Sequence, residues 1–85
     1  MKNTRNHNQI IYEHVDKVLL KHNFSIREIR TQKLSMSRRI LLAEAINEMR
    51  QESPCTLTYD ELARVFNKGR EWIHNTVNVF PQYYG

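Results

Sequence analysis

Five polar side chains near the C-terminal end carry hydrogen-bonding groups that can read nucleic-acid bases. They are Arg70, Glu71, His74, Asn75 and Asn78. On a helix, the last four share one face at positions i, i+3, i+4 and i+7. Asparagine can pair with the N6/N7 edge of adenine, histidine can donate to purine N7 or phosphate, and glutamate can accept from cytosine N4. The pattern predicts base contacts in a DNA major groove, with Arg70 placed to reach phosphate or guanine. A solvated helix face is the alternative.

The neighbouring sequence predicts how these side chains are positioned. Thr58 and Glu61 have the spacing of a capping box, which starts a helix whose inward face is Leu62, Ala63 and Phe66. The turn 67–69 ends that helix, and its asparagine and glycine can both adopt positive φ. A second helix is expected over about residues 70–80, and Pro81 should end it. Its expected inner face is Ile73, Val77 and Phe80. Two short helices joined by a glycine-containing turn are typical of a helix-turn-helix, which places its second helix in the major groove.

Basic side chains elsewhere are candidates for contact with a phosphate backbone. Two lie in a polar, basic connection between helices, for which a solvated loop is the alternative. Two begin a predicted helix, where the helix dipole disfavours positive charge and so favours a partner anion. For the second of these, Arg39, an ion pair with Glu44 or Asp60 is an equal alternative. A fifth lies in the turn 67–69. In chain order, these residues are Arg30, Lys33, Arg38, Arg39 and Lys68.

Three further helices are predicted upstream of residue 58. The first covers about residues 9–22, with Asn8 as its N-cap, because apolar residues recur on one face. A capping box at Ser25 and Glu28 starts a short second helix. The third covers about residues 37–51, and residues 53–56 should break it. Its apolar inner stripe is Leu42, Ala45, Ile46 and Met49, with Leu41 beside it.

Composition agrees with one helical domain. Of the 85 residues, 40% are hydrophobic and 26% are charged. Only two glycines and two prolines argue against disorder and against an all-β fold. We therefore expect an all-α fold of about five helices around one core over residues 9–80, between a flexible segment 1–8 and a tail 81–85.

The net charge and the number of cysteines indicate which partners and which cellular compartment to expect. The net charge is +4, and residues 1–36 carry the excess, with seven Lys/Arg against three acids, whereas residues 37–85 carry six of each. A basic balance favours a polyanionic partner. The one cysteine, Cys55, allows no intrachain disulfide, and no signal peptide is apparent, so a cytoplasmic location is expected. No apolar run approaches membrane-spanning length, so no membrane partner is expected.

Residue types used in catalysis and metal binding are present without the spacing that these functions need. His7, His14, His22 and His74 have no zinc-like spacing with one another or with Cys55. Cys55 lacks an obvious base, the acids form no paired carboxylates, and no glycine-rich phosphate loop exists. We expect no metal, no cofactor, no small-molecule substrate and no enzyme activity.

The order of these elements resembles the C-terminal DNA-binding domain of the bacterial replication initiator DnaA, which is related in fold to the Trp repressor. The nearest pieces are residues 25–30, 39–46 and 59–66, followed by Gly69-Arg70-Glu71 where the family begins its recognition helix. The alignment must be shifted by two residues before residues 74–77 match the signature that follows in the family. The resemblance implies a helix-turn-helix fold, sequence-specific binding of double-stranded DNA, and a role in DNA replication or transcription regulation.

The expected function is therefore that of a small double-stranded-DNA-binding protein. Its last helix would enter the major groove, while the basic loop with Arg30 and Lys33 would contact backbone or minor groove. The alternative is a protein-interaction module on the same scaffold, of mobile-element or phage origin and without DNA binding, that uses Trp72, Tyr83 and Tyr84 as anchors. For Trp72, packing against an earlier helix is the first interpretation.

Overall fold

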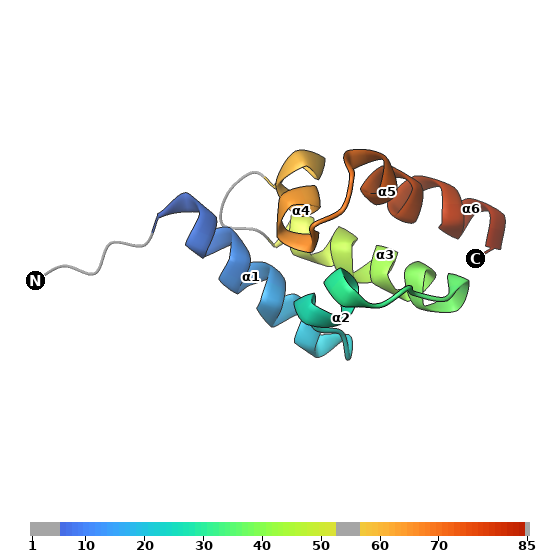
Figure 1. Cartoon of the computed structure of the whole chain (residues 1–85), viewed down its shortest axis with the longest axis horizontal. Coiled ribbons are helices and arrows are strands. Elements are labelled where there is room, and N and C mark those ends of the chain that lie inside the picture. The colour runs from blue at the N-terminus through green and yellow to red at the C-terminus, as the bar shows by residue number, and fades with distance from the viewer. Residues whose placement is uncertain (1–5, 53–56, 85) are drawn as a thin grey trace, which may run out of the picture.

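Helix α3 (Met36–Gln51) is the central element, and the other helices are arranged around it (Figure 1). The computed structural model describes residues 6–52 and 57–84. The remaining elements are α1 (His7–Lys21), α2 (Ile26–Thr31), α4 (Tyr59–Phe66), α5 (Arg70–His74), the π-helical segment η1 (Asn75–Val79) and α6 (Phe80–Tyr84). Because α5, η1 and α6 follow one another without a break, they form one helical stretch. The predicted all-α fold of about five helices is confirmed for the described residues.

One hydrophobic core joins these elements. Leu42 and Ile46 of α3, Leu19 of α1, Phe66 of α4 and Ile73 of α5 are all fully buried. Removing such large side chains from water is the main source of stability in a domain of this size. The predicted inward faces of α3 and α4 are confirmed, except at the edge of the α3 stripe. Leu41, expected beside that stripe, is 47% exposed.

Helix α1 begins two residues earlier than predicted because Asn6, not Asn8, is its N-cap. The Asn6 side chain accepts from the amide of Gln9 at 2.8 Å, and the Gln9 side chain accepts from the amide of Asn6 at 3.3 Å. This reciprocal pair is a capping box with glutamine in the third position. The helix ends at Lys21, one residue before the predicted end, and Asn23 follows with φ of 63°.

The predicted capping box at Ser25 is only half formed. The Ser25 hydroxyl accepts from the Glu28 amide at 3.0 Å, as expected. The Glu28 carboxylate does not reach back, because it accepts from Arg38 at 2.7 Å instead. Helix α3 starts at Met36 with Ser35 as its N-cap, one residue before the predicted start.

The turn between α4 and α5 uses asparagine rather than glycine for its left-handed residue. Asn67 has φ of 56°, as predicted, whereas Gly69 has φ of −77° and so does not need the freedom of glycine. A single left-handed residue at the end of α4 is enough to reverse the chain. Gly69 instead serves as the N-cap of α5.

Pro81 does not end the last helix, contrary to the prediction. The segment η1 precedes it, and the amide of Phe80 donates to the carbonyl of Asn75, five residues back. Proline clashes with the carbonyl four residues before it in a regular α-helix, so a wider π turn ahead of it relieves that clash. Pro81 then stands in the first turn of α6, directly after the π turn.

The π turn also changes which side chains face the core. Ile73, Val77 and Phe80 were expected to form the inner face, but among them only Ile73 is fully buried. Thr76 is fully buried instead, because the extra residue per turn in η1 rotates the positions that follow. The predicted break at residues 53–56, which includes Cys55, lies outside the described residues. In the described part of the chain, no helix has the length and apolar character needed to cross a membrane.

Candidate nucleic-acid interface

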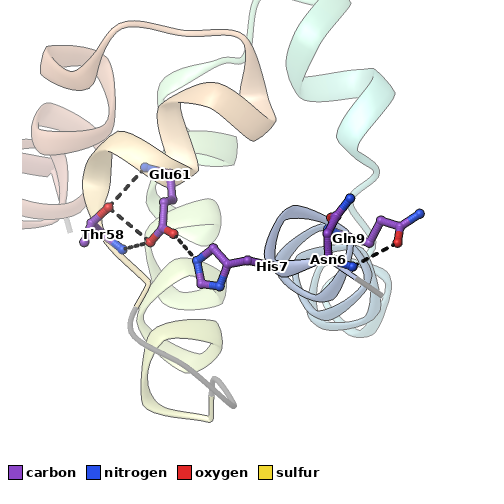
Figure 2. A network of polar contacts seen from close by, with 5 residues as sticks. All are labelled: Asn6, His7, Gln9, Thr58 and Glu61. Atoms are coloured by element: carbon purple, nitrogen blue, oxygen red, sulfur yellow. Dashed lines mark hydrogen bonds and ion pairs between the residues drawn. The ribbon is translucent and has the colours of Figure 1, made fainter. Parts of the chain in front are cut away.

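A network of side chains fixes the start of α4, the first helix of the α4–turn–α5 unit. The Thr58 hydroxyl accepts from the Glu61 amide at 3.2 Å, and the Glu61 carboxylate accepts from the Thr58 amide at 2.9 Å. This confirms the predicted capping box. Figure 2 shows His7 reaching from α1 to the same carboxylate, with its Nε2 2.7 Å from Glu61 Oε2. The first turn of α1 is thereby tied to the cap of α4.

The other α1 histidines also hold α1 in place. His14 Nε2 lies 2.7 Å from the carbonyl of Met49, and His22 Nε2 lies 2.9 Å from the carboxylate of Glu48. Lys21 donates to the other oxygen of Glu48 at 2.6 Å. Three of the four histidines considered as metal ligands therefore join α1 to α3 and α4. Among the described residues, no group of three or more His, Cys, Asp or Glu side chains could hold a metal ion.

These contacts lower the pKa of two carboxyl groups. The Thr58 amide, followed by His7, holds the pKa of Glu61 below its ordinary value of 4.5. Lys21, followed by His22, holds the pKa of Glu48 below the same value. A lowered pKa in the folded state means that the ionised carboxylate stabilises the fold. That stabilisation is complete above the unfolded-state pKa and is lost as pH falls through the lower folded-state pKa.

We therefore expect the free energy of unfolding to fall between about pH 6 and pH 3, with Glu48 and Glu61 responsible for part of the slope. The double variant Glu48→Gln/Glu61→Gln should be less stable than the unaltered protein at the upper pH and show a flatter dependence. Urea unfolding at each pH measures this. Glu44→Gln, at an exposed position on α3, is the matched control. An equal slope in the double variant and the unaltered protein would contradict the assignment.

The charged residues at the start of α5 lie on the molecular surface, as predicted. Arg70 and Glu71 are both exposed, and Arg70 Nε lies 3.7 Å from Asp60 Oδ1. This ion pair is open to water, with 73% and 64% of the two side chains exposed, so it adds little stability. The outer face at the start of α5 carries no net positive charge, since Asp60 and Glu71 offset Arg70.

The predicted base-reading residues further along the helix do not all point freely to solvent. Asn78 donates to the hydroxyl of Tyr59 at 3.0 Å and to the carbonyl of His74 at 3.2 Å. The ring of His74 stands edge-on to Tyr59, with centroids 6.3 Å apart. His74 and Asn78 are exposed, whereas Asn75, at the start of η1, is half-buried. The structure thus groups His74 and Asn78 around Tyr59 and sets Asn75 apart.

A basic groove lies beside the turn between α4 and α5. We use this name for a hollow of about 290 Å³ between the α2–α3 connection and that turn. It brings together four of the five predicted backbone-contact residues, Arg30, Lys33, Arg39 and Lys68, from positions up to 38 residues apart in the sequence. Its described lining contains four cations and no acid, which is the electrostatic character that a phosphate backbone requires. The full lining is Arg30, Thr31, Gln32, Lys33, Leu34, Arg39, Lys68 and Trp72.

Arg39 forms the inner wall of the groove. Its guanidinium lies 4.4 Å from the ring centroid of Trp72 and 4.0 Å from that of Phe80. It donates to the Thr76 hydroxyl at 2.7 and 3.1 Å and to the carbonyl of Trp72 at 3.2 Å. Burial lowers the pKa of this guanidinium below its ordinary value. The ion pair with Glu44 or Asp60 that the sequence allowed is wrong, because these donors are directed at Thr76 and Trp72.

Trp72 packs against the core, as its first interpretation predicted. It also carries cations over its ring. It is half-buried, and Lys68 Nζ lies 5.3 Å from its ring centroid, in addition to Arg39.

The sequence did not predict the buried Thr76. A threonine among polar residues of a helix gives no sign of burial until the π turn is known. The side chains of Tyr83 and Tyr84 lie outside what the structure describes.

Arg38 does not join the basic groove. It donates to Glu28 at 2.7 Å and to the carbonyl of Asn23 at 3.1 Å, and its guanidinium lies 4.0 Å from the ring centroid of Phe24. Although Arg38 and Arg39 are adjacent in sequence, they point to different sides of α3, about 100° apart around the helix. Arg38 therefore connects α3 to α2 and the end of α1.

Comparisons of the chain with protein-family models, with curated proteins and with solved structures give no match.

Proposed function

We propose that this chain is a double-stranded-DNA-binding protein with a helix-turn-helix similar to that of the DnaA C-terminal domain and the Trp repressor. The observation that carries the proposal is the basic groove directly beside the turn between α4 and α5. A helix-turn-helix binds with its second helix in the major groove and with basic side chains on the flanking phosphates. The groove supplies such side chains from Arg30, Lys33 and Lys68.

In this proposal, the outer face of α5 reads bases and the basic groove supplies affinity. Arg70, Glu71 and His74 are exposed along one side of the helical stretch, where base edges would lie. Glu71 can accept from cytosine N4, and Arg70 can donate to guanine or phosphate. A role in replication or transcription regulation in the cytoplasm follows from the resemblance and from the lone cysteine, and it belongs to the same proposal.

A duplex titration tests the proposal. Fluorescence anisotropy with random-sequence duplex at about 50 mM salt should show micromolar or tighter binding, and the affinity should fall steeply by about 200 mM. Sequencing of duplexes selected from a random pool would then give the preferred site. The absence of binding at micromolar protein, or binding that is indifferent to salt, would overturn the proposal.

The near-neutral outer face of α5 favours a second function, a protein-interaction module on the same scaffold. Asp60 and Glu71 offset Arg70 there, so the face lacks the positive charge that DNA attracts. Trp72 is a weak anchor for such a partner, because it is half-buried and carries Arg39 and Lys68 over its ring. Absent or salt-independent duplex binding would leave this second function as the better account.

A further inference from the structure

A second hollow, of about 170 Å³, lies between α1 and α4 and shares one residue with the basic groove. The shared residue is Arg30, which lines both. Figure 1 shows α4 standing between α1 and α5. We call the second one the α1–α4 hollow. Its described lining is Asn8, Ile11, Tyr12, Arg30, Glu61, Arg64 and Val65.

Arg30 is fixed at the junction of the two hollows. Its Nε donates to the carbonyl of Val65 on α4 at 2.7 Å. That bond uses one of the five N–H donors of the guanidinium, so the planar fork can still bind a phosphate. The backbone bond holds the side chain against α4, which lowers the entropy that binding would otherwise cost.

The α1–α4 hollow adds one cation and one aromatic ring to the same surface. Arg64 is exposed, and Tyr12 is 44% exposed, an unusually open position for a large ring. The one acid in the described lining, Glu61, already accepts from Thr58 and His7. The lining holds two arginines, Arg30 and Arg64, against this one carboxylate, so the net charge of the hollow is positive.

The arrangement of these cations points to an extended anion. A single phosphate would be held by groups that converge on one point, whereas the cations here are spread across two hollows that share Arg30. A DNA strand presents one charge about every 3.4 Å along the helix axis. Cations spread over two such hollows, with an exposed tyrosine in the second, match such a backbone and its sugars better than they match a small ligand.

We propose that the DNA-binding surface continues past Arg30 into the α1–α4 hollow, where Arg64 binds a backbone phosphate and Tyr12 packs against a sugar of the duplex that flanks the recognition site. This proposal rests on the proposed DNA-binding function. It adds α1 and the outer side of α4 to the contact surface, so the footprint on DNA is longer than that of the α4–turn–α5 unit and the basic groove alone.

The test uses the full chain and two duplexes that contain the same selected site, one of about one helical turn and one of about two turns. The double variant Tyr12→Ala/Arg64→Ala should bind the longer duplex about ten-fold more weakly, and its salt slope should be smaller by about one. Its affinity for the shorter duplex should stay within about two-fold of that of the unaltered protein. Thermal unfolding checks that the variant is folded.

The matched control is Lys17→Ala, which removes one charge from an exposed position on α1 that lines neither hollow. If the double variant behaves like this control on the longer duplex, the extended surface is wrong while duplex binding itself stands. If the double variant loses as much affinity for the shorter duplex as for the longer one, the assignment to flanking duplex is wrong. If the unaltered protein binds no duplex, both proposals are overturned together.

Discussion

Lys33→Ala/Lys68→Ala is expected to weaken duplex DNA binding about 30-fold, since two charge-assisted phosphate contacts at roughly 1 kcal/mol each are lost. The slope of log affinity against log salt should fall by about two, because each phosphate contact releases close to one counterion. Both side chains line the basic groove, and neither makes a hydrogen bond or ion pair within the described residues. Anisotropy titrations across a salt series measure both quantities.

The control variant removes the same number of positive charges from positions outside the basic groove. Lys17→Ala/Arg27→Ala alters two exposed basic residues on α1 and α2 that lie outside the basic groove. Its affinity should change by only a few fold, through the general field of the protein. Equal losses in the two double variants would mean that net charge, rather than the groove, attracts DNA.

Arg39→Ala is expected to lower the free energy of unfolding by about 2–4 kcal/mol, because it removes several charge-assisted hydrogen bonds and two cation–π contacts. The guanidinium joins α3 to the last helical stretch through Thr76, Trp72 and Phe80. Its loss leaves the buried Thr76 hydroxyl with only the carbonyl of Trp72 as a partner. Urea unfolding followed by circular dichroism measures the change.

Two further variants separate the parts of this effect. Arg39→Lys keeps the charge but cannot bond Thr76 and Trp72 at once with a planar fork, so it should recover only part of the stability. Thr76→Val removes the hydroxyl at similar volume, and the double-mutant cycle with Arg39→Ala isolates the coupling between them. A stability loss below about 1 kcal/mol for Arg39→Ala would show that the ring contacts and hydrogen bonds are not structural.

The arginine pair Arg38-Arg39 shows why candidate contact residues cannot be assigned from charge alone. Both were predicted to contact DNA backbone, and both cations lie against aromatic rings within the protein. Arg38 forms an ion pair with α2, whereas Arg39 contacts η1 and α6 and also lines the basic groove. A cation at a helix start is expected to need an acceptor or a π system as a partner. Its position does not indicate whether that partner lies within the protein or on a bound ligand.

Local signals in the sequence determined the helices and most of their starts. Thr58 and Glu61 form their predicted capping box because its atoms lie within four residues of each other. The apolar stripes that bury Leu42, Ile46 and Phe66 follow from the helical period in the same way. The all-α fold, the turn after α4 and the buried face of α4 could therefore be predicted without a structure.

Tertiary structure alone decided which partners Arg39 meets and the grouping of Arg30, Lys33, Arg39 and Lys68 around Trp72. The first depends on how α3 packs against the last helical stretch, and the second on how the α2–α3 connection meets the turn before α5. Both join residues more than thirty positions apart in the sequence. Capping hydrogen bonds and the helical spacing of apolar residues, by contrast, involve residues within one or two helical turns of each other. A long, charged side chain can reach partners on several neighbouring helices. Which of these helices lies next to it is fixed only when the whole core is packed.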